Sequence, residues 1–269
     1  MNPTSKERLK GMSFNKMIPN ILTLLAMSAG MTAIRFALQD RWELSVIAIV
    51  VASILDGLDG RIARILKGTS KFGAELDSLS DFICFGVAPA MMLYLWSMQE
   101  AGRFGWILVV LYSICCALRL ARFNTNMEQP DLPVWAYNFF SGVPAPMAAG
   151  LVLLPMILSF QFGRDILIRP EVTTLFLIAV SILMVSRIPT YSFKNFRVPL
   201  PWVLPTLLFV GIFAAFLVAE PWPTISVVMI LYAASFPLSI RSFRSLKKQA
   251  EALQRKSPPA KAEDLDDGE

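Results

Sequence analysis

Long apolar runs are the feature that most limits what this chain can fold into. Stretches close to the roughly 20 apolar residues that a helix needs to cross a bilayer recur along the sequence, and 55% of its 269 residues are hydrophobic. Inside lipid every backbone polar group must be bonded within the protein, so such runs are expected to be helices. The sequence therefore predicts an all-α integral membrane protein, a polytopic helical bundle.

We expect about eight transmembrane helices, because prolines and charged residues separate the apolar runs. The predicted spans cover residues 18–38, 44–66, 77–98, 105–122, 139–160, 172–188, 202–219 and 224–240. Residues 1–17 precede them as a polar, basic segment in the cytoplasm or at the membrane surface. Residues 242–269 contain little apolar surface, which predicts a disordered cytoplasmic tail.

The distribution of positive charge predicts the orientation of these spans. If the spans alternate, most of the 25 Lys and Arg residues lie on the same side as the N-terminus, even when the tail is left out. Cytoplasmic loops carry an excess of Lys and Arg. We therefore expect both termini on the cytoplasmic side of the cell (inner) membrane. The net charge of +5 is then explained by basic residues at the ends of the spans rather than by nucleic-acid binding.

Four acidic residues flank the connection between the second and third predicted spans. Asp56 and Asp59 are three positions apart, and Asp77 and Asp81 are four apart, so each pair lies on one helix face. A single acid near a span end usually only caps a helix or sits among headgroups. Charged residues at this depth are costly and usually face a cavity or a partner, so four in this pattern favour one common site between two helices.

The chemistry of this site is limited by the absence of histidine from the sequence. Histidine is the commonest general base and a common transition-metal ligand, so catalysis must use other groups. Converging carboxylates form a hard, all-oxygen site that suits Mg²⁺ or Mn²⁺. Two such ions about 3.5–4 Å apart are the usual arrangement for phosphoryl displacement, so we expect two divalent cations.

Small residues lie on the same helix stripes as the acids. Gly60 and Ala63 follow the first acid by four and seven positions, and Gly73 precedes the third by four. They would let a flat ligand approach the backbone, although small residues on membrane helices are more often packing contacts. Arg64, at the predicted helix end, is placed to bind phosphate.

The stretch from Asp56 to Asp81 resembles the signature of the CDP-alcohol phosphotransferase family, D-x2-D-G-x2-A-R-x8-G-x3-D-x3-D, at every fixed position. The matching residues are Asp56, Asp59, Gly60, Ala63, Arg64, Gly73, Asp77 and Asp81. The resemblance implies a core of six spans, usually dimeric, here residues 18–200, with two additional spans in residues 201–241. It also implies a CDP-linked donor and CMP as the leaving group.

The resemblance further implies roles for individual residues. Asp56, Asp59 and Asp77 would hold metal, and Asp81 would be both a metal neighbour and the general base. Asn20 and Thr23 match the family's pattern at the start of the first span, which faces the nucleotide, although a simple helix start would look the same. The expected CDP-lipid-binding residues are Asn20, Thr23, Gly60, Ala63, Arg64 and Gly73.

Three further segments, residues 117–124, 141–146 and 184–194, resemble the bacterial phosphatidylserine synthase branch of the family. The implied acceptor is L-serine, a zwitterion that needs cations for its carboxylate and hydrogen-bond acceptors for its ammonium group. The expected acceptor-binding residues are Arg119, Arg122, Asn124 and Lys194. The alternative interpretation is that these basic residues only anchor span ends.

The sequence thus predicts transfer of a phosphatidyl group from CDP-diacylglycerol to L-serine, which gives phosphatidylserine and CMP by a direct displacement assisted by two metal ions. Other acceptors, namely glycerol 3-phosphate, an inositol phosphate or choline, stay open. A divalent-cation transporter is the alternative from another class of protein. It would need further acids within the membrane, and the later spans contain almost none.

Overall fold

The computed structural model of the chain describes residues 14–66, 70–127, 139–163, 166–191, 199–243 and 245. The first half forms α1 (Phe14–Ala37), α2 (Trp42–Ile65), α3 (Lys71–Asp81), α4 (Ala88–Trp96) and α5 (Gly102–Met127). The second half forms α6 (Ala145–Val152), α7 (Leu154–Phe162), α8 (Pro170–Val185), α9 (Val203–Ala219) and α10 (Pro221–Ala234). Short 3₁₀ turns at Met98–Ala101 and Leu200–Trp202 precede α5 and α9.

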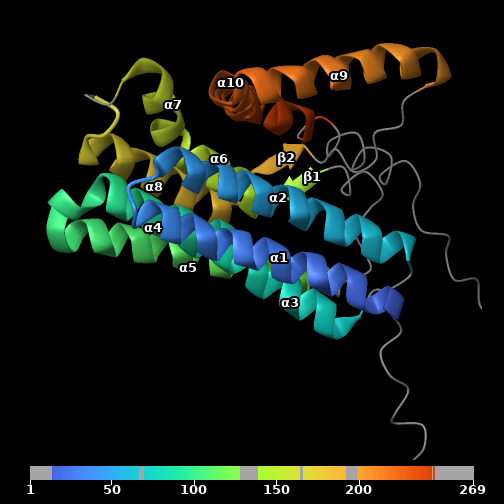
Figure 1. Cartoon of the computed structure of the whole chain (residues 1–269), viewed down its shortest axis with the longest axis horizontal. Coiled ribbons are helices and arrows are strands. Elements are labelled where there is room, and N and C mark those ends of the chain that lie inside the picture. Colours follow the sequence, from blue (N-terminus) through green and yellow to red (C-terminus); the bar gives the residue numbers. More distant parts are fainter. Residues whose placement is uncertain are drawn as a thin grey trace, which may run out of the picture.

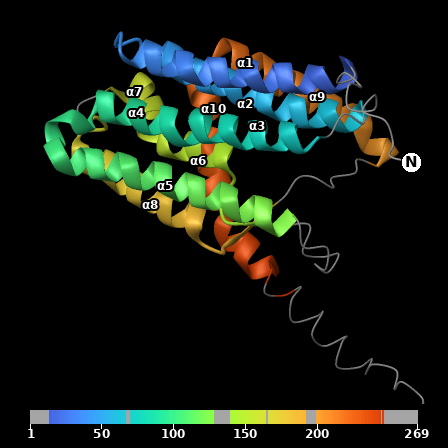
Figure 2. The ribbon, with the colours of Figure 1, turned by 90° about the horizontal axis from the view of Figure 1, so that it is seen from below.

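The helices pack in layers. Figure 1 shows α1 and α2 side by side along most of their length, running in opposite directions. Figure 2 shows α3 and α4 in the next layer and α5 and α8 beyond them. The end of α2, the start of α1 and all of α3 therefore meet at one end of the bundle.

The lengths of the helices fit a membrane protein. Four segments are long and apolar enough to cross a membrane: Met17–Ala37, Lys71–Trp96, Met98–Thr125 and Pro221–Phe243. A bent pair, α6 with α7, makes a fifth if it counts as one span, and α8 and α9 are shorter apolar helices. The prediction of a helical membrane bundle is thus confirmed, while the number of eight spans stays a prediction.

The helix α9 is apolar on every side. None of its residues, all of which are described, is buried within the chain, and Leu204 and Val218 are 78% and 86% exposed. An exposed surface of this kind is unfavourable in water and suits a lipid environment.

Two short strands depart from the all-helical prediction. β1 (Phe139–Ser141) pairs with β2 (Pro189–Tyr191) in antiparallel register, with Phe140 opposite Thr190. The predicted span over residues 139–160 therefore begins too early. Gly142 has a φ of +80°, a conformation that interrupts a helix, and α6 starts only at Ala145.

The same predicted span is also broken in the middle. α6 and α7 meet at an angle of 40°, and Pro155 lies in the first turn of α7. Proline has no N–H to donate to the carbonyl four residues earlier, so the helix cannot continue through it.

One π-helical turn, Phe82–Val87, follows α3 directly. The Tyr112 hydroxyl of α5 donates to the Phe85 carbonyl of this turn at 3.0 Å. A Cβ added to Gly86 would lie 3.1 Å from Cys116 Sγ, so the turn packs closely on α5. Single π turns are frequent at functional sites, and this one fixes the end of α3, where Asp81 lies.

Candidate active site

Three aspartates form a cluster where α2 and α3 meet. One carboxylate oxygen from each of Asp56, Asp59 and Asp77 lies within 4.8 Å of the others. Asp59 is buried, and the other two are half-buried. The structure therefore brings together acids that are far apart in the sequence, as their helical spacing predicted.

The position of α3 depends on contacts at its first turn. Ser70 Oγ accepts a hydrogen bond from the Gly73 backbone N–H at 3.0 Å, which caps the helix. A Cβ added to Gly73 would lie 2.9 Å from Asn20 Oδ1, so α1 and α3 touch at this glycine. This close approach sets the position of Asp77, one turn further along α3.

Thr23 connects α1 to both acidic helices. Its hydroxyl donates to Asp59 Oδ2 at 2.6 Å, and its backbone carbonyl accepts from Ser80 Oγ at 3.2 Å. The hydroxyl thus fixes a carboxylate of the cluster, and contact of Thr23 with a nucleotide stays a prediction.

Asp81 lies one turn beyond Asp77, at the end of α3, and its oxygens are not among the three that lie within 4.8 Å of one another. Its carboxyl interacts with that of Asp56. One of its oxygens, Asp81 Oδ1, is buried and has no hydrogen-bond donor among the described residues. A buried carboxylate oxygen without a partner is costly, so this atom is suited to receive a ligand's proton.

Arg119 brings positive charge to the acids from α5. Its guanidinium interacts electrostatically with Asp56 and Asp81 and lies over the Phe123 ring, 5.9 Å from the centroid. Arg119, which the sequence suggested for acceptor binding, thus interacts with the aspartates.

The other predicted acceptor-binding residues have different surroundings. The Arg122 guanidinium donates to the carbonyls of Val185 and Ser186 at 2.8 and 3.0 Å, at the C-terminal end of α8. A cation there satisfies free carbonyls and complements the helix dipole. Asn124 Nδ2 donates to Ser78 Oγ at 2.9 Å and so joins α5 to α3. Lys194 lies outside the described residues.

The structure leaves space beside the small residues of α2. A Cβ added to Gly60 would have no described atom within 4 Å outside its own helix backbone, and Ala63 is half-buried. Arg64 is exposed, and its Nε donates to the Gly60 carbonyl at 3.1 Å. This face of α2 therefore has room for a ligand beside the acids.

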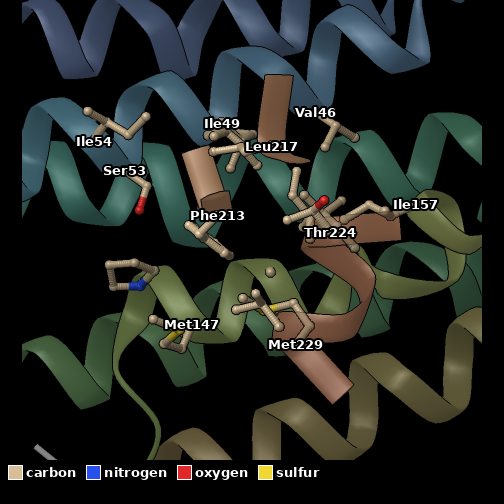
Figure 3. Close-up of a pocket in the computed structure, with 16 residues that line it drawn as sticks. Val46, Ile49, Ser53, Ile54, Met147, Ile157, Phe213, Leu217, Thr224 and Met229 are labelled. Atoms are coloured by element: carbon tan, nitrogen blue, oxygen red, sulfur yellow. The ribbon is translucent and has the colours of Figure 1, made fainter. Parts of the chain in front are cut away.

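An apolar cavity of about 180 Å³ lies between α2 and the second half of the chain. Figure 3 shows Val46, Ile49 and Ser53 of α2 on one side, with Phe213 and Met229 facing them from α9 and α10. Ser53 is three positions before Asp56, on the same face of α2. The cavity therefore begins close to the acidic cluster and follows α2 away from it.

The acidic cluster fits a hard divalent cation. Carboxylate oxygens bind such ions at about 2.0–2.6 Å, so oxygens that share an ion are at most about twice this distance apart. The separations within 4.8 Å meet this condition. Carboxylates alone, without sulfur or imidazole, favour Mg²⁺ or Mn²⁺ over softer metals.

Some contributors to the site gave no clear signal in the sequence. Ser80 and Ser78 are ordinary polar residues of α3 until packing places them against Thr23 and Asn124. Ser70 could have been found, because a serine just before a helix start is a common cap.

Comparison with known proteins agrees with this geometry. The family described as CDP-alcohol phosphatidyltransferase matches residues 16–239. This chain belongs to the CDP-alcohol phosphatidyltransferase family. The region that matches the family begins in α1 and extends beyond the end of α10, so the apolar cavity lies within it.

Several curated members of the family are similar to this chain over most of its length. A protein of Mycobacterium tuberculosis is 38% identical over 247 residues, which cover 92% of this chain and 86% of that one. A protein of Helicobacter pylori is 37% identical over 216 residues, 80% of this chain and 87% of its own. A protein of Bacillus subtilis is 36% identical over 178 residues, 66% of this chain and 92% of its own. All three are named CDP-diacylglycerol–serine O-phosphatidyltransferase.

Proposed function

We propose that this chain transfers the phosphatidyl group of CDP-diacylglycerol to L-serine and releases phosphatidylserine and CMP. The observation that carries the proposal is the cluster of Asp56, Asp59 and Asp77 at the junction of α2 and α3, in a member of the CDP-alcohol phosphatidyltransferase family. Relatives named for transfer to serine support the choice of acceptor.

The aspartate cluster has the donors to hold the divalent ions of the reaction. Asp56, Asp59 and Asp77 would bind one or two Mg²⁺ or Mn²⁺ ions, with Asp81 as their neighbour. Such ions neutralise the charge of a pyrophosphate and of the departing phosphate. The hydrogen bond from Thr23 holds Asp59 in one orientation, which favours a defined coordination geometry.

Asp81 is the general base of the proposed reaction. Its buried Oδ1 has no partner among the described residues and takes the proton of the serine hydroxyl. The serine oxygen forms a bond to the phosphorus that carries the diacylglycerol, and the bond from this phosphorus to the CMP oxygen breaks. The serine hydroxyl is a weak acid, so most of the rate acceleration comes from positioning and from charge stabilisation.

The two substrates approach the acids from different sides. The CDP group lies along the open face of α2 and the contact between α1 and α3, where the residues are Asn20, Thr23, Gly60, Ala63, Arg64 and Gly73. Serine lies toward α5, where Arg119 supplies a cation for the carboxylate. Arg122, Asn124 and Lys194 complete this side, with Arg122 also capping α8.

The apolar cavity suggests where part of the donor's hydrocarbon lies. It starts at Ser53, one turn from Asp56, and its wall is formed almost entirely by apolar side chains. An acyl chain attached to a phosphate at the aspartates would run along α2 into this cavity, because both ends of that path lie on one helix face.

The membrane setting follows from the helices and the charge pattern. We assign eight spans: α1, α2, α3 with α4, α5, α6 with α7, α8, α9 and α10. The excess of Lys and Arg puts both termini and the aspartates on the cytoplasmic side of the inner membrane. We further propose a homodimer, as the family resemblance implies.

The experiment that tests the function uses purified chain with CDP-diacylglycerol, Mn²⁺ or Mg²⁺ and one alcohol at a time. We expect CMP release with L-serine, and little with glycerol 3-phosphate, inositol phosphate or choline. Activity with another of these alcohols alone would overturn the serine assignment. Flux of divalent ions into liposomes without CDP-diacylglycerol would indicate a transporter instead.

A further inference from the structure

Tyr232, on α10, has a buried hydroxyl that the reaction described above does not use. Its oxygen is inaccessible to solvent and makes no hydrogen bond of ordinary length with a described residue. Its polar neighbour is the Thr190 side chain, whose hydroxyl donates to the Gly142 carbonyl at 2.9 Å instead. The ring packs edge-on against Phe236, with centroids 5.1 Å apart. Buried tyrosine hydroxyls usually have a partner, so the position of this one suggests a ligand.

The surroundings of this hydroxyl connect it to the acids. Tyr232 interacts electrostatically with Arg119, and Arg119 interacts in turn with Asp81. Tyr232 Oη and Asp81 Oδ1 are both buried and lack partners among the described residues. The Arg119 guanidinium therefore interacts with two residues that each have an unpaired buried oxygen, Tyr232 on α10 and Asp81 on α3.

Contacts before and after Tyr232 in the sequence hold it in place. Ile225 and Met229 precede it on the same face and pack against the hydrophobic core. Two turns later, Ser239 Oγ donates to the Pro189 carbonyl of β2 at 2.7 Å. The hydroxyl is thus held by packing, although it has no hydrogen bond of its own within the described residues.

We propose that Tyr232 is an acceptor-binding residue whose hydroxyl donates a hydrogen bond to the carboxylate of the amino-acid acceptor. This inference rests on the function proposed above. Arg119 pairs with the same carboxylate, since a carboxylate has lone pairs for several donors. The acceptor's own hydroxyl then faces Asp81 Oδ1, at the opposite side of the guanidinium.

The consequence is a role for the last helices of the chain. α10 lies beyond the six-span core that the sequence suggested, and it contributes a polar group to the site through Tyr232. An acceptor without a carboxylate would leave this hydroxyl and Arg119 without their partner, which would select against such acceptors.

The test is steady-state kinetics of Tyr232→Phe, which removes the hydroxyl and keeps the ring. We expect KM for L-serine to rise about ten- to a hundredfold, because a hydrogen bond to a charged group is lost. We expect kcat and KM for CDP-diacylglycerol to change little. The preference for L-serine over L-serinamide, which lacks the carboxylate, should fall by a similar factor.

Tyr94→Phe is the matched control. Tyr94 lies on α4 and packs edge-on against Trp106, with centroids 5.4 Å apart, so its kinetics should equal those of the unchanged chain. The melting temperature of Tyr232→Phe should not fall, since the hydroxyl bonds to no described residue.

Three outcomes would overturn the inference: an unchanged KM for serine, a rise in KM for CDP-diacylglycerol instead, or a lower melting temperature with unchanged discrimination against serinamide. These differ from failure of the proposed function. In that case the unchanged chain itself would release no CMP with L-serine.

Discussion

Thr23 Oγ1 donates a hydrogen bond to Asp59 Oδ2 at 2.6 Å and so joins α1 to the acidic face of α2. The Pro19 carbonyl lies 3.1 Å from the same hydroxyl, but the single proton favours the shorter contact with a carboxylate. In the proposed metal site this hydroxyl would orient the Asp59 carboxylate, as hydrogen-bond partners of metal ligands generally do.

Replacement of Thr23 by valine should therefore weaken metal binding. The change keeps the shape of the side chain and removes the donor, so we expect the Mn²⁺ or Mg²⁺ concentration for half-maximal CMP release to rise about tenfold or more. Thr23→Ser keeps the hydroxyl and should preserve most of the affinity. Equal metal dependence of the valine and serine variants would contradict this role.

Asp81→Asn should abolish turnover and leave the binding of CDP-diacylglycerol largely unchanged. Loss of a general base costs about 10²–10⁴-fold in rate, whereas the proposed binding of CDP-diacylglycerol depends on the other three aspartates. The rate of CMP release and the equilibrium binding of the CDP-lipid would be measured on the same preparation. Glu75→Gln, at an exposed acid of the same helix, is the control, and normal turnover by Asp81→Asn would rule out the assignment.

Arg119→Gln and Arg122→Gln should separate acceptor binding from helix capping. Arg122 donates to carbonyls at the end of α8, so its replacement should destabilise the fold by about 1–3 kcal/mol. Arg119 interacts with Asp56 and Asp81, so its replacement should mainly raise KM for serine. Thermal unfolding and serine titration distinguish the two, and identical profiles would show that both residues have the same role.

Alanine should have different effects on stability and activity at Gly60 and at Gly73. At Gly73 the new Cβ would meet Asn20 Oδ1 at 2.9 Å, which would push α3 away from α1, so both stability and activity should fall. At Gly60 the described structure leaves space, so alanine should raise stability by up to about 1 kcal/mol through helix propensity. Reduced activity in that stable variant would indicate that the donor uses the space; unchanged activity would mean that it does not.

Ser53→Phe should narrow the cavity shown in Figure 3 near its end at the aspartates. If an acyl chain enters there, KM for long-chain CDP-diacylglycerol should rise severalfold more than KM for a short-chain analogue, because an added side chain excludes hydrocarbon that had been accommodated. The ratio of the two KM values is the measurement. A ratio equal to that of the unchanged chain would place the hydrocarbon elsewhere.

The spacing of the acids was enough to predict the centre of the site. Helical periodicity put Asp56 with Asp59 and Asp77 with Asp81, and the structure confirms that three of these lie together. The prediction worked because positions three or four apart share a helix face whatever surrounds the helix.

Predictions that depended on apolarity alone were less accurate. Phe139 and Phe140 looked like the start of a span and form a strand instead, because hydrophobicity does not distinguish a short strand from a helix start. For Arg122 the structure adds a contact with carbonyls of α8, and acceptor binding by this residue stays a prediction. A basic residue near a span end has the same sequence pattern in either role.

The sequence by itself determined a helical membrane protein and the grouping of its aspartates on helix faces, since both follow from local composition and periodicity. Only the tertiary structure decided which side chains of other helices lie against those aspartates: Thr23 from α1 and Arg119 from α5. These contacts depend on the rotation and crossing of packed helices. Many side chains along the chain act together to set that packing, and no local pattern specifies it.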